Sequence, residues 1–141
     1  MRWLMAVAAA AVAFAVHGQD AGEIKSVRGS VHVERDGQRL AATPGMNVRA
    51  SDRLVTGAFS SVGVTFLDNT MMSAGPNSVL EIERYQFNST THAGHFDASL
   101  KKGSLAVVSG KMVKQAPGSM RVKTPSSIMG VRGTEFLVRV D

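Results

Sequence analysis

The sequence predicts an all-β protein: a single domain of short strands, arranged as a β-sandwich or as a β-solenoid-like stack. Two observations predict this class. After residue 22, apolar and polar residues alternate in most segments, which is the period-two pattern of half-buried strands. Turn-forming residues separate these segments at intervals of roughly eight to fifteen residues. Helix signals are nearly absent from the same region.

The first residues do not belong to the predicted domain. Met1-Arg2 is followed by an apolar run from Leu4 to Val16, and Val16-His17-Gly18 places small residues at the −3 and −1 positions. This pattern predicts a secretory signal peptide over residues 1–18 and a β domain over residues 19–141. Cleavage after Ala15 is a second option. An uncleaved anchor is disfavoured, because the run is short for a span of roughly 20 residues.

The predicted signal favours a periplasmic or secreted location in a bacterium, with no stable membrane anchor after cleavage. The chain has no cysteine, so neither disulfides nor a thiol-linked lipid can hold the exported domain. Sixteen Lys and Arg face eleven Asp and Glu. The regional basic excess is interpreted first as a solvated sheet face and alternatively as a patch for an acidic partner; it comprises Lys101, Lys102, Lys111, Lys114, Arg121 and Lys123.

Nucleic acid is not expected as a partner. Export removes the chain from most nucleic acid, and one Trp and one Tyr give little surface on which bases could stack.

The predicted inward faces follow from the alternation along each strand. The residues expected to be buried are Val31, Val33, Val62, Val64, Phe66, Leu80, Ile82, Leu105, Val107, Met120, Val122, Phe136, Val138 and Val140. Asp36-Gly37 predicts a two-residue hairpin, because a type I′ turn needs positive φ at both positions. Further turns are expected at Pro44-Gly45, Asp68-Asn69, Gly75-Pro76-Asn77, Gly110-Lys111 and Pro117-Gly118.

Three segments share a pattern of small residues followed by two apolar residues separated by one position. They begin at Gly29, Ser60 and Gly103. Their unequal spacing does not define a strict repeat, and either solenoid coils or related strands of a sandwich would explain them. In both cases the small residues should let neighbouring layers approach closely.

The C-terminal stretch from Thr124 to Val140 is predicted to close the fold. Pro125 lacks an amide hydrogen and biases Thr124 to an extended conformation. Two glycines, at positions 130 and 133, can adopt positive φ or let another strand approach. We expect Val131 and Phe136 to point inward, which makes the following residues a structural signature: Thr124, Pro125, Gly130, Val131, Gly133 and Phe136. The alternative is a ligand contact made by Arg132 and Thr134.

The sequence favours neither catalysis nor a cofactor. His92-x-x-His95 lies in a Ser-, Thr- and Gly-rich stretch with Asp97 as the nearby carboxylate, so a polar loop is expected and no metal site is assigned. No serine lies in a nucleophile elbow. The methionines are interpreted as gap-filling core residues, and Met71 and Met72 should point to opposite faces of a strand.

The order of these segments resembles the FecR domain family over nearly the whole predicted domain. The resemblance rests on Gly29-Ser30-Val31-His32-Val33, on Ser61 to Thr70, and above all on Val122-Lys123-Thr124-Pro125 with Gly130-Val131-Arg132-Gly133-Thr134-Glu135-Phe136. It implies an exported all-β domain. In the best-understood members this domain relays the state of an outer-membrane receptor to a cytoplasmic sigma factor during metal uptake.

The sequence shows neither the N-terminal cytoplasmic segment nor the interior transmembrane helix of those members, so direct control of a sigma factor is the least favoured interpretation. We instead expect a non-enzymatic interaction, signalling or scaffold module of the cell envelope with a protein partner. Binding of peptidoglycan or another cell-wall glycan is the alternative, although sugar-binding surfaces usually rely on Trp and Tyr.

Overall fold

The computed structural model describes residues 20–141, which form twelve strands and one short helix. The predicted signal peptide lies outside the described residues. In chain order the elements are β1 (Asp20–Arg28), β2 (Val31–Arg35), β3 (Gln38–Ala41), β4 (Asn47–Arg49), β5 (Arg53–Thr56), β6 (Ser61–Phe66), β7 (Met71–Ala74), β8 (Val79–Phe87), β9 (Gly94–Val108), α1 (Lys111–Gln115), β10 (Met120–Lys123), β11 (Ile128–Gly130) and β12 (Glu135–Val140).

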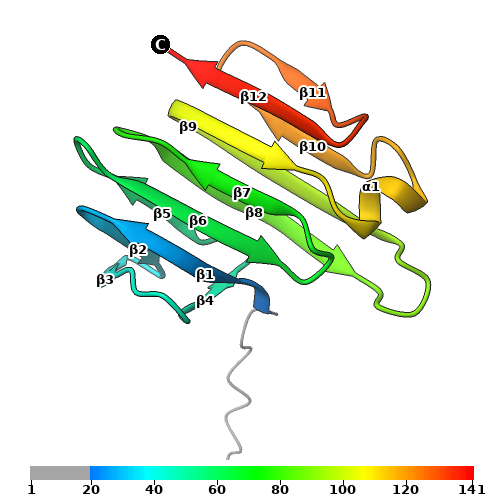
Figure 1. Cartoon of the computed structure of the whole chain (residues 1–141), viewed down its shortest axis with the longest axis horizontal. Helices are drawn as coiled ribbons and strands as arrows, with labels where there is room; N and C mark the ends of the chain where they lie inside the picture. Colours follow the sequence, from blue (N-terminus) through cyan, green and yellow to red (C-terminus); the bar gives the residue numbers. More distant parts are fainter. Residues whose placement is uncertain (1–19) are drawn as a thin grey trace, which may run out of the picture.

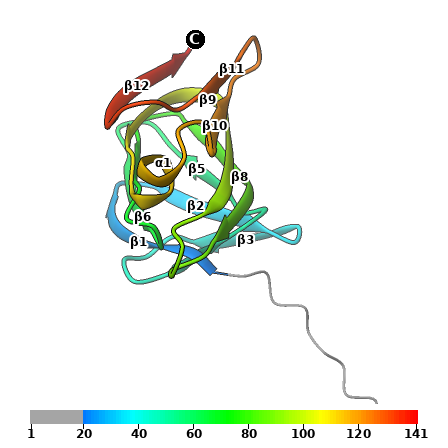
Figure 2. The same cartoon turned by 90° about the vertical axis from the view of Figure 1, so that its right-hand side faces the viewer.

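The strands form one continuous, mostly antiparallel sheet that curls into a half-barrel (Figures 1 and 2). Its order is β3-β2-β5-β8-β9-β7-β6-β1-β4, and β10 and β12 pair with different parts of β9. The predicted all-β class is therefore confirmed. We call the half with β4, β1, β6, β7 and β12 the A layer, and the half with β3, β2, β5, β8, β10 and β11 the B layer.

The long strand β9 belongs to both layers. Its N-terminal part pairs with β8 and, in parallel, with β10, whereas its C-terminal part lies between β7 and β12. The two layers therefore face each other as in a sandwich. They are joined along one edge by chain segments that cross from layer to layer, as in a stack of coils.

The joined edge is built from the small-residue segments that the sequence singled out. The chain crosses between layers at Gly29, between β5 and β6, between β7 and β8, and at Gly103. A Cβ on Gly103, whose φ is +92°, would lie 2.5 Å from the Cα of Ser78. The hydroxyl of Ser78 accepts a hydrogen bond from the N–H of Ser104 at 3.0 Å. Close approach of the layers, as predicted, thus depends on missing side chains at this edge.

The core lies between the layers and contains most of the expected inward residues; Phe136 and Val140, at the C-terminal end, are only partly buried. Three aromatic rings form its centre: Phe66 lies 4.6 Å from Phe96 and 5.6 Å from Tyr85, measured between ring centroids.

Two features complete the core. Met72 is buried while Met71 is half-exposed, which confirms the predicted opposite faces. Helix α1 lies across one open end of the half-barrel, where it contributes the buried side chain of Met112 (Figure 2).

The predicted turns are confirmed at the hairpin between β2 and β3, where Asp36 and Gly37 have φ values of 51° and 74°. The prediction of a turn at Gly110-Lys111 was wrong, because Lys111 starts α1. Gly110 lies against the main chain of residues 68–70, and the N–H of Lys111 donates to the carbonyl of Asp68 at 2.7 Å. This long-range contact fixes the start of the helix.

Candidate functional site

The signature residues begin in a tight turn that connects β10 to β11. The N–H of Thr124 donates to the carbonyl of Ser127 at 2.8 Å, and the N–H of Ser127 donates back to the Thr124 hydroxyl at 3.1 Å. Pro125 is exposed within this turn. The turn makes β11 run antiparallel to β10, so the strand becomes the outermost one of the B layer.

The chain then crosses from the B layer to the A layer through residues 131–134. Val131 is 2% exposed, and its N–H donates to the carbonyl of Met120 at 2.9 Å. The Ser109 hydroxyl donates to the carbonyl of Gly133 at 2.6 Å. Gly133 has a φ of +93°, whereas Gly130 has no positive φ and has open space where a Cβ would lie. The crossing therefore requires glycine at position 133 but not at position 130.

Strand β12 is the outermost strand of the A layer. It pairs along its whole length with β9, from Glu135 opposite Val108 to Val140 opposite Gly103. Val138 is buried, whereas Phe136 is only partly buried and Leu137 is 83% exposed. Among residues 20–141, no strand pairs with the other side of β12. We call this side the β12 edge.

The ladder shows which main-chain groups face the β12 edge. The N–H of Ser109 donates to the carbonyl of Thr134, directly opposite, at 2.7 Å. In an antiparallel pair the hydrogen-bonded positions alternate, so the even-numbered residues of β12 bond to β9. The N–H and C=O groups of Glu135, Leu137 and Arg139 consequently point outward from the β12 edge.

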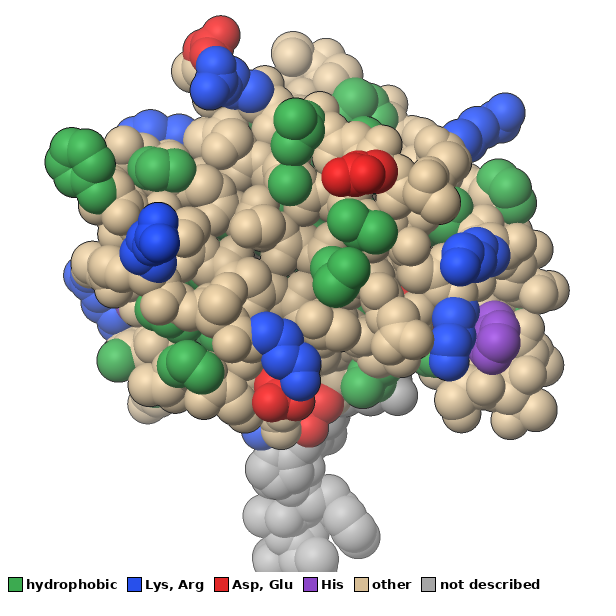
Figure 3. Space-filling view, in the orientation of Figure 1, with side chains coloured by type: hydrophobic (Ala, Val, Ile, Leu, Met, Phe, Trp, Pro, Cys, Tyr) green, Lys and Arg blue, Asp and Glu red, His purple; other side chains and the backbone are tan. Residues whose placement is uncertain are grey.

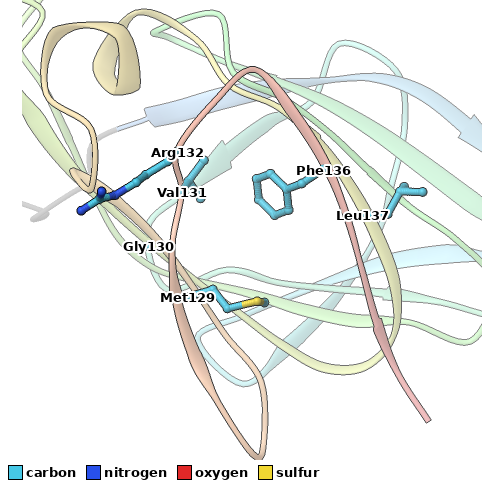
Figure 4. Close-up of a pocket in the computed structure, with 6 residues that line it drawn as sticks. All are labelled: Met129, Gly130, Val131, Arg132, Phe136 and Leu137. Atoms are coloured by element: carbon cyan, nitrogen blue, oxygen red, sulfur yellow. The ribbon is translucent and has the colours of Figure 1, made fainter.

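An apolar groove lies between the β11 end of the B layer and β12. Its volume is about 250 Å³, and its lining comprises Met129, Gly130, Val131, Arg132, Phe136 and Leu137. Figure 4 shows Val131 and Phe136 pointing toward one another across the groove, while Leu137 and Arg132 point away on opposite sides. We call this feature the C-terminal groove.

The two residues proposed for binding lie at this groove or beside it. Arg132 is exposed and borders the groove. The side chain of Thr134 is also exposed, but its carbonyl is held by Ser109. The structure therefore brings both residues to the same end of the molecule as Phe136 and Leu137, which sequence reasoning had not connected with a surface.

The outer faces of the two layers differ in chemistry. The B layer carries ion pairs between its strands: Arg53 on β5 with Glu81 on the neighbouring β8 at 3.3 Å, and Lys123 on β10 with Glu83 on β8, across β9, at 3.0 Å. The A layer instead presents a row of small or apolar residues in register: Ser26, Gly63, Ser73, Ala106 and Leu137. Figure 3 shows this face as mostly uncharged, with charged side chains mainly toward its rim.

The predicted basic excess does not form one uniform patch. Lys123 pairs with Glu83, and Arg121 lies 4.0 Å from Asp97.

His92 is in the turn between β8 and β9, where its ring stacks on Phe87. Within the described part of the chain, no group of three His, Cys, Asp or Glu side chains could hold a metal ion.

Two buried polar clusters were missed by sequence reasoning. Asp68 accepts hydrogen bonds from the hydroxyls of Tyr85 at 3.0 Å and Thr70 at 2.8 Å. Burial, followed by the charge of Asp68, raises the pKa of Tyr85 above its ordinary value. Asp52 accepts two hydrogen bonds from the guanidinium of Arg35, at 2.8 and 2.6 Å. Both carboxylates are closed off from solvent, so they stabilise turns and do not form an open site.

The fold and its C-terminal crossing agree with the family resemblance. Compared with known protein families, residues 52–141 match the family described as FecR protein, and the chain belongs to this family. The matched region includes the whole crossing and β12. The resemblance noted from the sequence is confirmed over these residues, whereas the segment from Gly29 to Val33 lies outside the match.

A search among curated proteins finds no match. Among solved structures, a chain described as a cell surface anchoring domain is similar at 31% sequence identity. The alignment covers 45% of this chain and 86% of that chain, with a TM-score of 0.44. Of the helices within residues 20–141, none is both long enough and apolar enough to cross a membrane.

Proposed function

We propose that this protein is an exported, non-catalytic interaction module of the cell envelope, and that it binds a partner protein at its C-terminal end. The observation that carries the proposal is the β12 edge beside the C-terminal groove. An unpaired strand offers main-chain hydrogen bonds to an extended segment, and adjacent apolar pockets select its side chains. Membership of the FecR family supports the envelope setting.

The exposure of apolar residues supports this surface over others. Ile128 and Leu137 are strongly exposed, and Met129 and Phe136 lie beside them. Apolar residues gathered at one end are typical of protein interaction sites, whereas single exposed residues are ordinary. Phe59, at the turn between β5 and β6, is such a single residue.

Glycan binding is less well supported. The single Tyr is buried, and Phe66 and Phe96 are in the core, so these rings cannot stack on a sugar. Phe59 is exposed but isolated, so the described residues supply little aromatic platform for peptidoglycan. Signalling to a sigma factor remains an alternative role for the same interaction surface.

The experiment captures proteins from an envelope extract with the purified chain and compares variants. We expect a specific partner to be retained by the Phe59→Asn control and lost with Leu137→Asp, because the charge would be placed at the β12 edge. Co-sedimentation with purified peptidoglycan runs in parallel. Binding to peptidoglycan alone, unaffected by Leu137→Asp, would show that the proposed function is wrong.

A further inference from the structure

We propose that the strand added to the β12 edge is β12 of a second copy of this chain, which makes a two-fold symmetric dimer. The inference rests on the proposed function, because both assign binding to the same edge. It goes further by identifying the partner strand and its register. The argument uses the direction of the main-chain groups, the sequence of β12 and the exposure of its side chains.

The main chain restricts the registers that are allowed. Only Glu135, Leu137 and Arg139 direct their N–H and C=O groups away from β9, as the alternation from the Ser109–Thr134 bond requires. In an antiparallel pair of identical strands, these outward residues must lie opposite one another. Registers that place an odd-numbered residue opposite an even-numbered one leave the outward groups without partners.

The side chains then select one register. With Leu137 opposite Leu137 of the second copy, Glu135 lies opposite Arg139, and the symmetry repeats this pair on the other side of the axis. Opposite charges in cross-strand positions are stabilising, and like charges in the same positions are destabilising. The charges of β12 are therefore complementary to themselves in this register.

The other allowed registers lose this match. A shift of two residues in one direction places Leu137 opposite Glu135, and a shift of two in the other direction places it opposite Arg139. A shift of four residues places Glu135 opposite Glu135, or Arg139 opposite Arg139. Each of these arrangements pairs an apolar residue with a charge or brings two like charges together.

The same register also covers the apolar residues that the monomer leaves exposed. Leu137 is 83% exposed on the outer face and would contact its symmetry mate. On the inner face, the partly buried Phe136 would lie opposite Val138 of the second copy. The row of small residues on the A layer would continue across the axis into the same row of the second copy. This is the self-complementary patch that a two-fold interface needs.

The first test measures the mass of the purified protein by sedimentation equilibrium. Glu135→Arg and Arg139→Glu each convert both attractive pairs into repulsive ones, so we expect each variant to weaken dimerisation roughly tenfold or more. The double variant Glu135→Arg/Arg139→Glu restores opposite charges in the same register and should recover the dimer. A monomeric wild-type protein would overturn the proposal. So would a dimer whose affinity is unchanged by both Glu135→Arg and Arg139→Glu.

The second test uses the absence of cysteine from the chain. Leu137→Cys places one thiol next to the two-fold axis, at a separation that suits a disulfide between copies. We expect mild oxidation to give a covalent dimer. Ser73→Cys is the matched control, because Ser73 is exposed on the same outer face but lies on β7, inside the A layer. Equal cross-linking of both variants would contradict the predicted register.

The two proposals fail in different ways. A monomeric protein that still captures an envelope protein through Leu137 would overturn the dimer and leave the proposed function standing. A dimer with the predicted charge dependence that captures no other protein would support the dimer and count against a separate envelope partner.

Discussion

At the scale of single residues, the two signature glycines have different roles. Gly133 has a φ of +93°, which a β-branched residue rarely adopts, whereas Gly130 is in ordinary extended backbone with open space around it. We expect Gly133→Val to destabilise the fold by about 1–3 kcal/mol, lowering the melting temperature by several degrees. Gly130→Val is the control and should change it little. Equal melting temperatures for both variants would show that the strain at position 133 is unimportant.

Tyr85 gives a second residue-scale prediction, with a defined pH dependence. Its hydroxyl donates to Asp68 and accepts from the Asp68 N–H, so Tyr85→Phe should cost about 1–2 kcal/mol at neutral pH. The pKa of Tyr85 is raised in the fold, mainly by burial. Its stabilising effect is therefore complete below the unfolded pKa of about 10 and is lost as the pH rises from there toward the raised pKa of the folded state.

Urea denaturation of wild type and Tyr85→Phe between pH 7 and pH 11 checks this sign. The stability gap between the two proteins should shrink above about pH 10, because only the wild-type unfolded chain gains a tyrosinate at this position. A gap that widens with pH would contradict the assignment.

Sequence reasoning worked well for residues whose environment follows from alternation alone. Val31, Val62 and Leu105 are each on the predicted inward face. The Asp68–Tyr85 cluster could not be predicted, because the two residues are 17 positions apart and meet only after β6 and β8 face each other. Asp68 looks like an ordinary turn residue until that contact forms.

At the scale of elements, the joined edge of the two layers decides how the strands stack. Gly103 and Gly118 both have positive φ, at 92° and 89°, but only Gly103 is crowded by Ser78. An alanine at either position therefore has the same unfavourable positive φ. Only the Cβ of Gly103→Ala would also clash with Ser78. We expect Gly103→Ala to cost about 1–3 kcal/mol more than Gly118→Ala, as measured by chemical denaturation. Similar losses in the free energy of unfolding for the two variants would indicate that the two layers can move apart at the joined edge without a measurable cost.

Element boundaries were predictable where turn chemistry is local. Asp36-Gly37 sets the β2–β3 hairpin, and its residues alone supply the required positive φ. The N-terminal part of β9 was not predicted. Its buried positions are even-numbered at Phe96 and Ala98, and odd-numbered at Leu105 and Val107, because the strand changes layers at Gly103. Lys101 and Lys102 are both exposed where the buried positions change from even to odd numbers, and in the sequence such a polar pair resembles a turn.

At the scale of the whole molecule, the C-terminal crossing was predicted as a constrained element, but its surface was not. The sequence predicts the constraint that Pro125 places on Thr124 and the inward direction of Val131, which is buried. The groove and the β12 edge depend on strand order, which places β11 and β12 at the same end of different layers. Strand order is a property of the complete fold, so no local pattern could reveal which edge stays unpaired.

The last prediction concerns how the crossing contributes to cooperativity. Residues 124–141 cover one side of β9, bury Val131 and Val138, and provide the carbonyls that bind Ser109. Ending the chain at Lys123 would remove both outermost strands, leave the Ser109 groups without their partners and expose the apolar side chains that now pack against the crossing.

We therefore expect the shortened protein to lose its cooperative urea transition, and fluorescent dyes that bind exposed apolar surface should bind it more strongly than the intact chain. Gly130→Val in the intact chain serves as a control for handling and for the β11 region. A shortened protein that unfolds cooperatively with an unchanged midpoint would show that β1 to β10 are stable alone. In that case the crossing would form the C-terminal groove and the β12 edge but would not stabilise the core.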